Sequence, residues 1–112
     1  MTDFELKLAI QKTLNETIKA RMTIEALTAM RALPESQRSK AALQLSNLVL
    51  ASRQITNLRI AEIRKELQEN SQDLVVGIKQ LKKALNKIDN AKKVIQSTAD
   101  FLKVIAKLVV LL

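Results

Sequence analysis

Apolar residues recur at helical spacing along almost the whole chain. In the first third, Leu6, Ile10, Leu14 and Ile18 stand four residues apart, which places them on one face of an α-helix. Beyond Arg21 the apolar stripe moves round to other positions, namely Met22, Ala26, Ala29, Met30 and Leu33. A helix with apolar groups on so much of its surface packs against more than one neighbour.

Local signals divide the chain into three predicted helices. Thr2 and Glu5 have the spacing of a capping box, which marks a helix start. Pro34 lacks an amide hydrogen and disfavours helical geometry at the residue before it, so one helix ends there and the next begins. The polar run 70–73 predicts a second boundary. We therefore expect a single helical domain over residues 1–112, with helices over about 3–33, 35–69 and 72–112.

The last predicted helix carries the most regular pattern. One set of its apolar residues recurs every seven positions without a gap, at Leu74, Leu81, Ile88, Ile95, Leu102 and Val109. A sustained seven-residue repeat favours left-handed packing against a partner helix. The fold we predict is all-α, an elongated antiparallel three-helix bundle with coiled-coil-like packing. An alternative is that the second and third helices are continuous in an oligomeric coiled coil, because Ile60 and Leu67 extend the same step backward across the polar run.

Composition supports a folded helical protein and excludes most catalytic chemistry. One glycine and one proline in 112 residues leave little material for hairpins, and 47% of the residues are hydrophobic. Cysteine and histidine are both absent, which removes thiol nucleophiles, histidine bases and the usual metal ligands. A single glycine also excludes a glycine-rich phosphate loop. We expect no enzymatic activity, no cofactor and no small-molecule substrate.

The net charge of +8 is concentrated in the last third of the sequence. Residues 74–112 hold eight lysines against two acids, whereas the rest of the chain holds eleven Lys and Arg against nine acids. Six of these lysines make up a predicted basic face: Lys79, Lys82, Lys83, Lys87, Lys92 and Lys93. The simplest interpretation is the solvated face of an amphipathic helix. The functional alternative is a surface that attracts nucleic-acid phosphates or anionic lipid headgroups.

The stretch FLKVIAKLVVLL, residues 101–112, has ten apolar residues out of twelve. On a continuous helix only the line through Lys103 and Lys107 would be polar. The apolar residues define a predicted interaction surface: Phe101, Leu102, Val104, Ile105, Leu108, Val109, Val110, Leu111 and Leu112. Burying six or seven such side chains is worth on the order of 10 kcal/mol, so we expect another surface to cover them.

These features favour a protein-interaction or structural module whose surplus apolar surface is completed by self-association or by a partner helix. A first alternative is docking on an anionic membrane, with the apolar stretch at the lipid boundary. Twelve helical residues cover about 18 Å of a hydrocarbon core of about 30 Å, so this stretch does not read as a spanning helix. A second alternative is sequence-unspecific nucleic-acid binding. The first ten residues lack the features of a secretion signal, so we expect a cytoplasmic protein.

Overall fold

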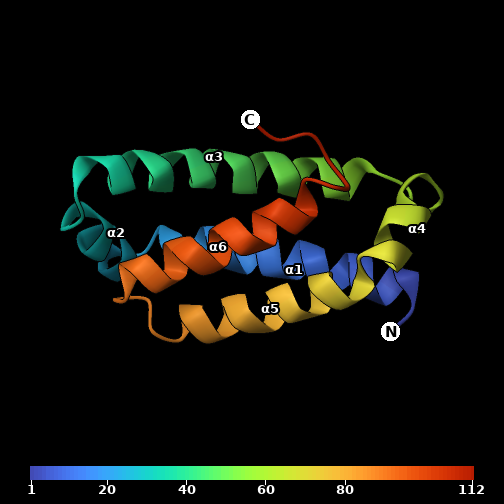
Figure 1. Ribbon diagram of the computed structural model, residues 1–112, viewed down its shortest axis with the longest axis horizontal. Coiled ribbons are helices and arrows are strands. Elements are labelled where there is room, and N and C mark those ends of the chain that lie inside the picture. The colour runs from blue at the N-terminus through green and yellow to red at the C-terminus, as the bar shows by residue number, and fades with distance from the viewer.

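The computed structural model describes residues 1–112 and contains α-helices without any strand (Figure 1). The expected all-α class is confirmed. Six helices follow one another along the chain: α1 (Asp3–Arg21), α2 (Ile24–Arg31), α3 (Glu35–Asn57), α4 (Ile60–Glu69), α5 (Ser71–Leu85) and α6 (Ala91–Ile105). The capping box forms as predicted, since Thr2 Oγ1 accepts from Glu5 N at 3.1 Å and Glu5 Oε1 accepts from Thr2 N at 3.0 Å.

The predicted first helix is in fact two helices joined by a corner. The hydroxyl of Thr23 holds this corner, because it donates to the Ala20 carbonyl at 2.8 Å and accepts from Ala26 N at 3.2 Å. The side chain thereby closes α1 and caps α2. The shift of the apolar stripe beyond Arg21 coincides with this change of direction.

The predicted second helix is also broken, between Asn57 and Ile60, where Leu58 and Arg59 have extended backbones. The boundary predicted at residues 70–73 is present, since α4 ends at Glu69 and α5 begins at Ser71. These two interruptions rule out the alternative of a continuous helix through the second and third segments.

The predicted third helix folds back on itself. A turn over residues 86–90 separates α5 from α6, and the Asn90 side chain caps α6 by accepting from Lys93 N at 3.3 Å. The helix then ends at Ile105, and the final residues form a turn and an extended tail. The seven-residue repeat still marks buried positions in both helices, but it serves two short helices that pack on each other rather than one long one.

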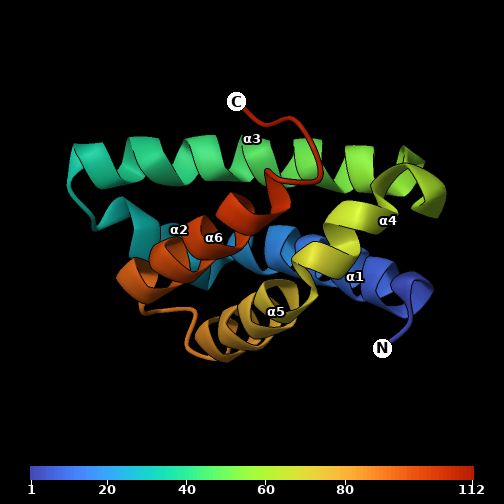
Figure 2. The same ribbon diagram turned by 45° about the vertical axis from the view of Figure 1, so that its right-hand side comes forward.

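The helices form an elongated body with extents of 43 × 25 × 19 Å (Figures 1 and 2). Helix α1 packs against α3, α4 and α5, and α6 packs between α5 and α3. The main core collects the large apolar residues of α1, α3, α5 and α6, with Ile63 and Leu67 from α4. A second, smaller core ties α2 and α3 to α5 and α6 at one end of the body: Met30, Ala41, Ala84, Ala91, Val94 and Ile95.

Candidate interaction site

The predicted C-terminal interaction surface lies mostly inside the chain's own core. Phe101, Leu102, Ile105, Leu108 and Val109 are buried in the main cluster, and two further members, Val104 and Leu111, are half-buried against it. The two that remain, Val110 and Leu112, are 78% and 79% exposed. The premise that another molecule must cover these side chains was wrong, because α6 ends at Ile105 and the tail folds back over α3.

The tail runs beside α3 (Figure 1), and two amide side chains of this helix hold it there. Val110 N donates to Gln54 Oε1 at 3.0 Å, and Gln54 Nε2 donates back to the Val110 carbonyl. Two residues further on, Leu112 N donates to Asn47 Oδ1 at 2.9 Å, and Asn47 Nδ2 lies 3.5 Å from the Leu112 carbonyl. Each amide therefore pairs in both directions with one backbone unit, and Leu111 between them turns toward the core.

The six predicted basic-face lysines are all exposed, but they do not line one helix face. They are distributed over α5, the turn that follows it and the start of α6. Folding brings most of them to the same end of the body as the corner between α1 and α2 and the start of α3 (Figure 1). We call residues 19–40 and 82–96 together the basic end.

The basic end concentrates nearly all of the excess charge. Its two segments hold ten Lys and Arg against three Asp and Glu, an excess of seven. All other residues hold nine against eight, an excess of one. The sequence alone assigned the excess to the last third of the chain, whereas the fold adds the arginines of the first two helices and of α3. The result is a body that is strongly cationic at one end and nearly neutral over the rest.

Arg21 lies in the interior of this end and is only 4% exposed. Its guanidinium donates to Gln44 Oε1 at 2.8 Å and to the Ala41 carbonyl at 3.0 Å. Gln44 in turn donates to the Ile95 carbonyl at 2.9 Å, so a chain of hydrogen bonds joins α1, α3 and α6. Both acceptors of Arg21 are neutral, and no carboxylate forms an ion pair with it.

Burial lowers the pKa of the Arg21 guanidinium from its ordinary value to about 10. The group therefore stays charged at neutral pH although most of its hydration is lost. A buried charge without a counter-ion is costly, and an anion brought close to it offsets part of that cost. The sequence carried one signal for this position, since Arg21 lies seven residues beyond the buried Leu14 and thus continues the apolar stripe of α1.

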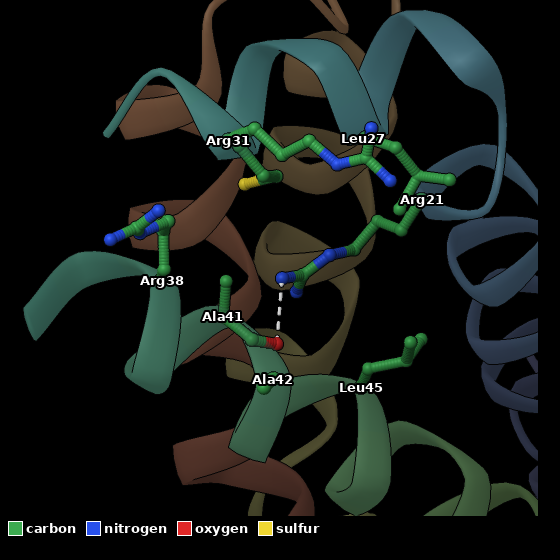
Figure 3. A pocket seen from close by; sticks show the side chains of 8 residues that line it. Arg21, Leu27, Arg31, Arg38, Ala41, Ala42 and Leu45 are labelled. Atoms are coloured by element: carbon green, nitrogen blue, oxygen red, sulfur yellow. Dashed lines mark hydrogen bonds between the residues drawn. The ribbon is translucent and has the colours of Figure 1, made fainter. Parts of the chain in front are cut away.

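A cavity of about 240 Å³ opens beside Arg21, between α2 and α3 (Figure 3). Figure 3 shows Arg21 reaching across to Ala41, with Arg31 on α2 and Arg38 on α3. The cavity is lined by three arginines and five apolar residues: Arg21, Leu27, Met30, Arg31, Arg38, Ala41, Ala42 and Leu45. No acidic side chain lines it, so the combination of an apolar wall and unopposed cations is suited to a ligand that is both apolar and anionic. We call this cavity the arginine pocket.

Comparisons with known proteins give no information on function, so the proposal below rests on the geometry of the arginine pocket. No known protein family, curated protein or solved structure matches the chain. Two negative findings describe the structure itself. None of its helices combines the length and the apolar character needed to cross a bilayer. Nor does it gather three or more acidic side chains into a group that could hold a metal ion.

Proposed function

We propose that this chain is a non-enzymatic protein-interaction module that docks an acidic, amphipathic segment of a partner protein at its basic end. The observation that carries the proposal is the arginine pocket, in which a buried arginine with only neutral hydrogen-bond partners lies beside an apolar cavity. Arg31 and Arg38 add two exposed cations at the same cavity. Arginine is enriched among the residues that dominate binding energy at protein interfaces.

The size of the arginine pocket favours a side chain over a free ligand. Small-molecule sites usually enclose about 300–1,000 Å³, whereas this cavity measures about 240 Å³. A space of about 150 Å³ already holds a benzene ring, so one large apolar side chain fits here. A helical partner segment would insert such a residue between Leu27 and Leu45 and place carboxylates one turn away, within reach of Arg31 and Arg38.

The two alternative partners match this site less well. Nucleic acid offers phosphates but no apolar group to fill the cavity, and the chain has only two aromatic residues on which bases could stack. Docking on a membrane was predicted from an apolar C-terminal stretch at the lipid boundary. In the structure most of that stretch is buried against α3 and the main core. The lysines of the basic end are therefore the only feature left that supports membrane docking.

A synthetic helix of about 20 residues that carries leucine and glutamate four residues apart tests the proposal. We expect it to bind the intact chain and to lose affinity as salt rises, because exposed ion pairs are screened. Replacing its glutamates by glutamine, or its leucines by alanine, should each weaken binding. The proposal is contradicted if the alanine peptide binds as tightly as the parent, because charge alone would then explain the association.

Two substitutions in the chain, each with a control, test separately whether a cation and whether the open cavity contribute to peptide binding. Arg38→Gln should weaken binding of the peptide by roughly threefold or more, whereas Arg53→Gln, an exposed position on the same helix outside the basic end, should leave it unchanged. Ala42→Phe fills the arginine pocket while keeping every cation, and Ala61→Phe places the same side chain at an exposed position of α4. Equal peptide affinities for the Ala42→Phe and Ala61→Phe variants would refute docking in the pocket.

A further inference from the structure

A second cavity, of about 350 Å³, opens between α5 and α6. The turn over residues 86–90 reverses the chain, so these two helices run side by side (Figures 1 and 2). No apolar residue lines this cavity, in contrast to the arginine pocket. We call it the polar cavity. Its lining residues are Gln80 and Lys83 on α5, and Lys93, Gln96, Ser97 and Asp100 on α6.

Ser97 contributes a buried hydroxyl that has no partner within the chain. The residue is only 8% exposed, yet its hydroxyl takes part in none of the side-chain hydrogen bonds of the fold. The other three buried hydroxyls, those of Thr13, Thr17 and Thr98, each donate to the backbone carbonyl four residues earlier. Buried polar groups in proteins almost always have a hydrogen-bond partner. The free hydroxyl of Ser97 on the wall of the polar cavity therefore indicates a polar partner inside it.

Two lysines line the same cavity from different helices. Lys83 on α5 and Lys93 on α6 are both exposed, and neither forms an ion pair with a carboxylate. They bring two positive charges to the cavity against the single negative charge of Asp100. The side-chain amides of Gln80 and Gln96 add further N–H donors. A small anion in this cavity would meet two ammonium groups and a hydroxyl, which form strong hydrogen bonds to charged acceptors.

Asp100 narrows the choice of anion. Its Oδ1 accepts from Gln96 Nε2 at 2.9 Å, which orients the carboxylate and leaves its other oxygen without a partner in the chain. An ionised carboxylate can only accept hydrogen bonds, so it repels an anion that carries no proton. Inorganic phosphate keeps at least one proton at neutral pH and can donate it to Asp100. Sulfate and the phosphodiesters of nucleic acids have no proton to donate.

We propose that the polar cavity binds inorganic phosphate in the form of hydrogenphosphate. The ammonium groups of Lys83 and Lys93 and the hydroxyl of Ser97 donate to its unprotonated oxygens, and its own P–OH donates to Asp100. The cavity is larger than the ion, so water molecules complete the contacts. The site lies between α5 and α6, whereas the arginine pocket lies between α2 and α3. The inference therefore does not depend on the proposed function.

Titration of the isotope-labelled full chain with sodium phosphate, followed by NMR, tests the proposal. Sodium sulfate at the same ionic strength is the comparison. We expect the Ser97 backbone amide and the side-chain amides of Gln80 and Gln96 to shift and to saturate at roughly millimolar phosphate. Sulfate should bind at least tenfold more weakly, because one hydrogen bond to a charged group is worth about that factor. The absence of saturable shifts at these groups would overturn the proposal. Equal affinities for both anions would also overturn it, because positive charge alone would then attract an adventitious ion only.

The role of the carboxylate has its own test. Asp100→Asn should raise the affinity for sulfate and reduce the preference for phosphate to about threefold or less, because an amide can donate as well as accept. Asp89→Asn makes the same change of charge in the turn before α6, outside the cavity, and should leave the preference unchanged. An unchanged preference in Asp100→Asn, or an equal loss in both variants, would contradict the binding of a protonated anion.

Ser97→Ala should weaken phosphate binding roughly tenfold, because a hydrogen bond to a charged group is lost. Ser46→Ala removes an exposed hydroxyl from α3 and should have no effect. Lys93→Gln should weaken the binding of both anions, whereas Lys92→Gln makes the same change of charge one residue away, outside the cavity, and should not. Equal effects of the two lysine substitutions, or unchanged binding in Ser97→Ala, would overturn the site. Circular dichroism checks that each variant remains helical.

Discussion

Arg21 and Gln44 share a hydrogen bond of 2.8 Å that fixes a guanidinium in the interior of the basic end, where no carboxylate accompanies it. Proteins usually bury a charge only when it is paired. Here neutral carbonyl oxygens orient the group, and the charge itself is left uncompensated beside an open cavity. The same hydrogen bonds that stabilise the junction of α1, α3 and α6 therefore also present a cation to an incoming anion.

Arg21→Lys should lower the free energy of unfolding by about 1–2 kcal/mol, because a single ammonium cannot reproduce the planar fork that reaches both Gln44 and Ala41. Urea unfolding followed by circular dichroism measures the change. Arg53→Lys, at an exposed position, is the control and should have no measurable effect. If Arg21→Lys is as stable as the unmodified chain, the two hydrogen bonds do not carry the role assigned to them.

The lowered pKa of Arg21 predicts a pH dependence of stability. Above about pH 10, and up to the ordinary pKa of an arginine, the unfolded chain binds more protons at this group than the folded chain does, so the free energy of unfolding rises with pH over that window. The cost of burying the charge is fully present below about pH 10. Comparing the unmodified chain with Arg21→Gln isolates the contribution of this one group. The stability difference between them should shift in favour of the unmodified chain as pH rises, and a constant difference would contradict the burial.

Gln54→Ala should release the tail from α3 and cost about 1–2 kcal/mol, because both hydrogen bonds to Val110 are lost. Hydrogen exchange gives the most specific measurement. The Val110 amide should exchange much faster, while the amides in the middle of α3 keep their protection. Arg53→Ala changes the adjacent residue and serves as the control. Unchanged exchange at Val110 would show that other contacts hold the tail.

Gly77→Ala should destabilise the fold by about 1–3 kcal/mol, even though alanine normally favours a helix over glycine by about 1 kcal/mol. A Cβ atom at residue 77 would lie 2.9 Å from Cδ1 of Phe101, so the close packing of α5 on α6 depends on the missing side chain. Thermal unfolding tests the prediction, with Gln80→Ala on the exposed side of α5 as the control. A stabilised Gly77→Ala variant would contradict the close approach.

The sequence was sufficient for the fold class and for those boundaries that have strong local chemistry. The capping box of Thr2, the stop at Pro34 and the turn near Asn70 all appear where they were expected. The corner at Thr23 and the break at Leu58 were missed, because no glycine or proline marks them. The hydroxyl of Thr23 fixes the corner through local hydrogen bonds, whereas no side-chain cap accompanies the start of α4 after the break at Leu58.

The seven-residue repeat illustrates how a correct pattern led to a wrong helix. Leu74, Leu81, Ile95 and Leu102 are buried as the repeat requires, yet the chain reverses between Leu81 and Ile95. The same spacing directs side chains to the core in one long helix and in two helices packed side by side, so periodicity alone does not distinguish them. For this reason residues 101–112 were predicted to form an interaction surface on one continuous helix, whereas most of their apolar side chains complete the main core.

The arginine pocket was not predicted because its three arginines come from three helices, and only the fold brings them together. Arg21 lies on the apolar stripe of α1, and this position is the one signal for the pocket in the sequence. Arg31 and Arg38 read as ordinary surface cations. The lysines of the predicted basic face were identified correctly as exposed, while their grouping with these arginines depends on the α5–α6 reversal.

Chemical-shift mapping by NMR, in which the isotope-labelled chain is titrated with the leucine–glutamate peptide, tests docking at the basic end most directly. We expect the largest changes on the Arg21 side-chain Nε–H, the Leu27 and Leu45 methyl groups and the Ala42 amide, which together surround the cavity. Changes confined to the lysines of α5 and α6, or to the α3 residues that hold the tail, would contradict it.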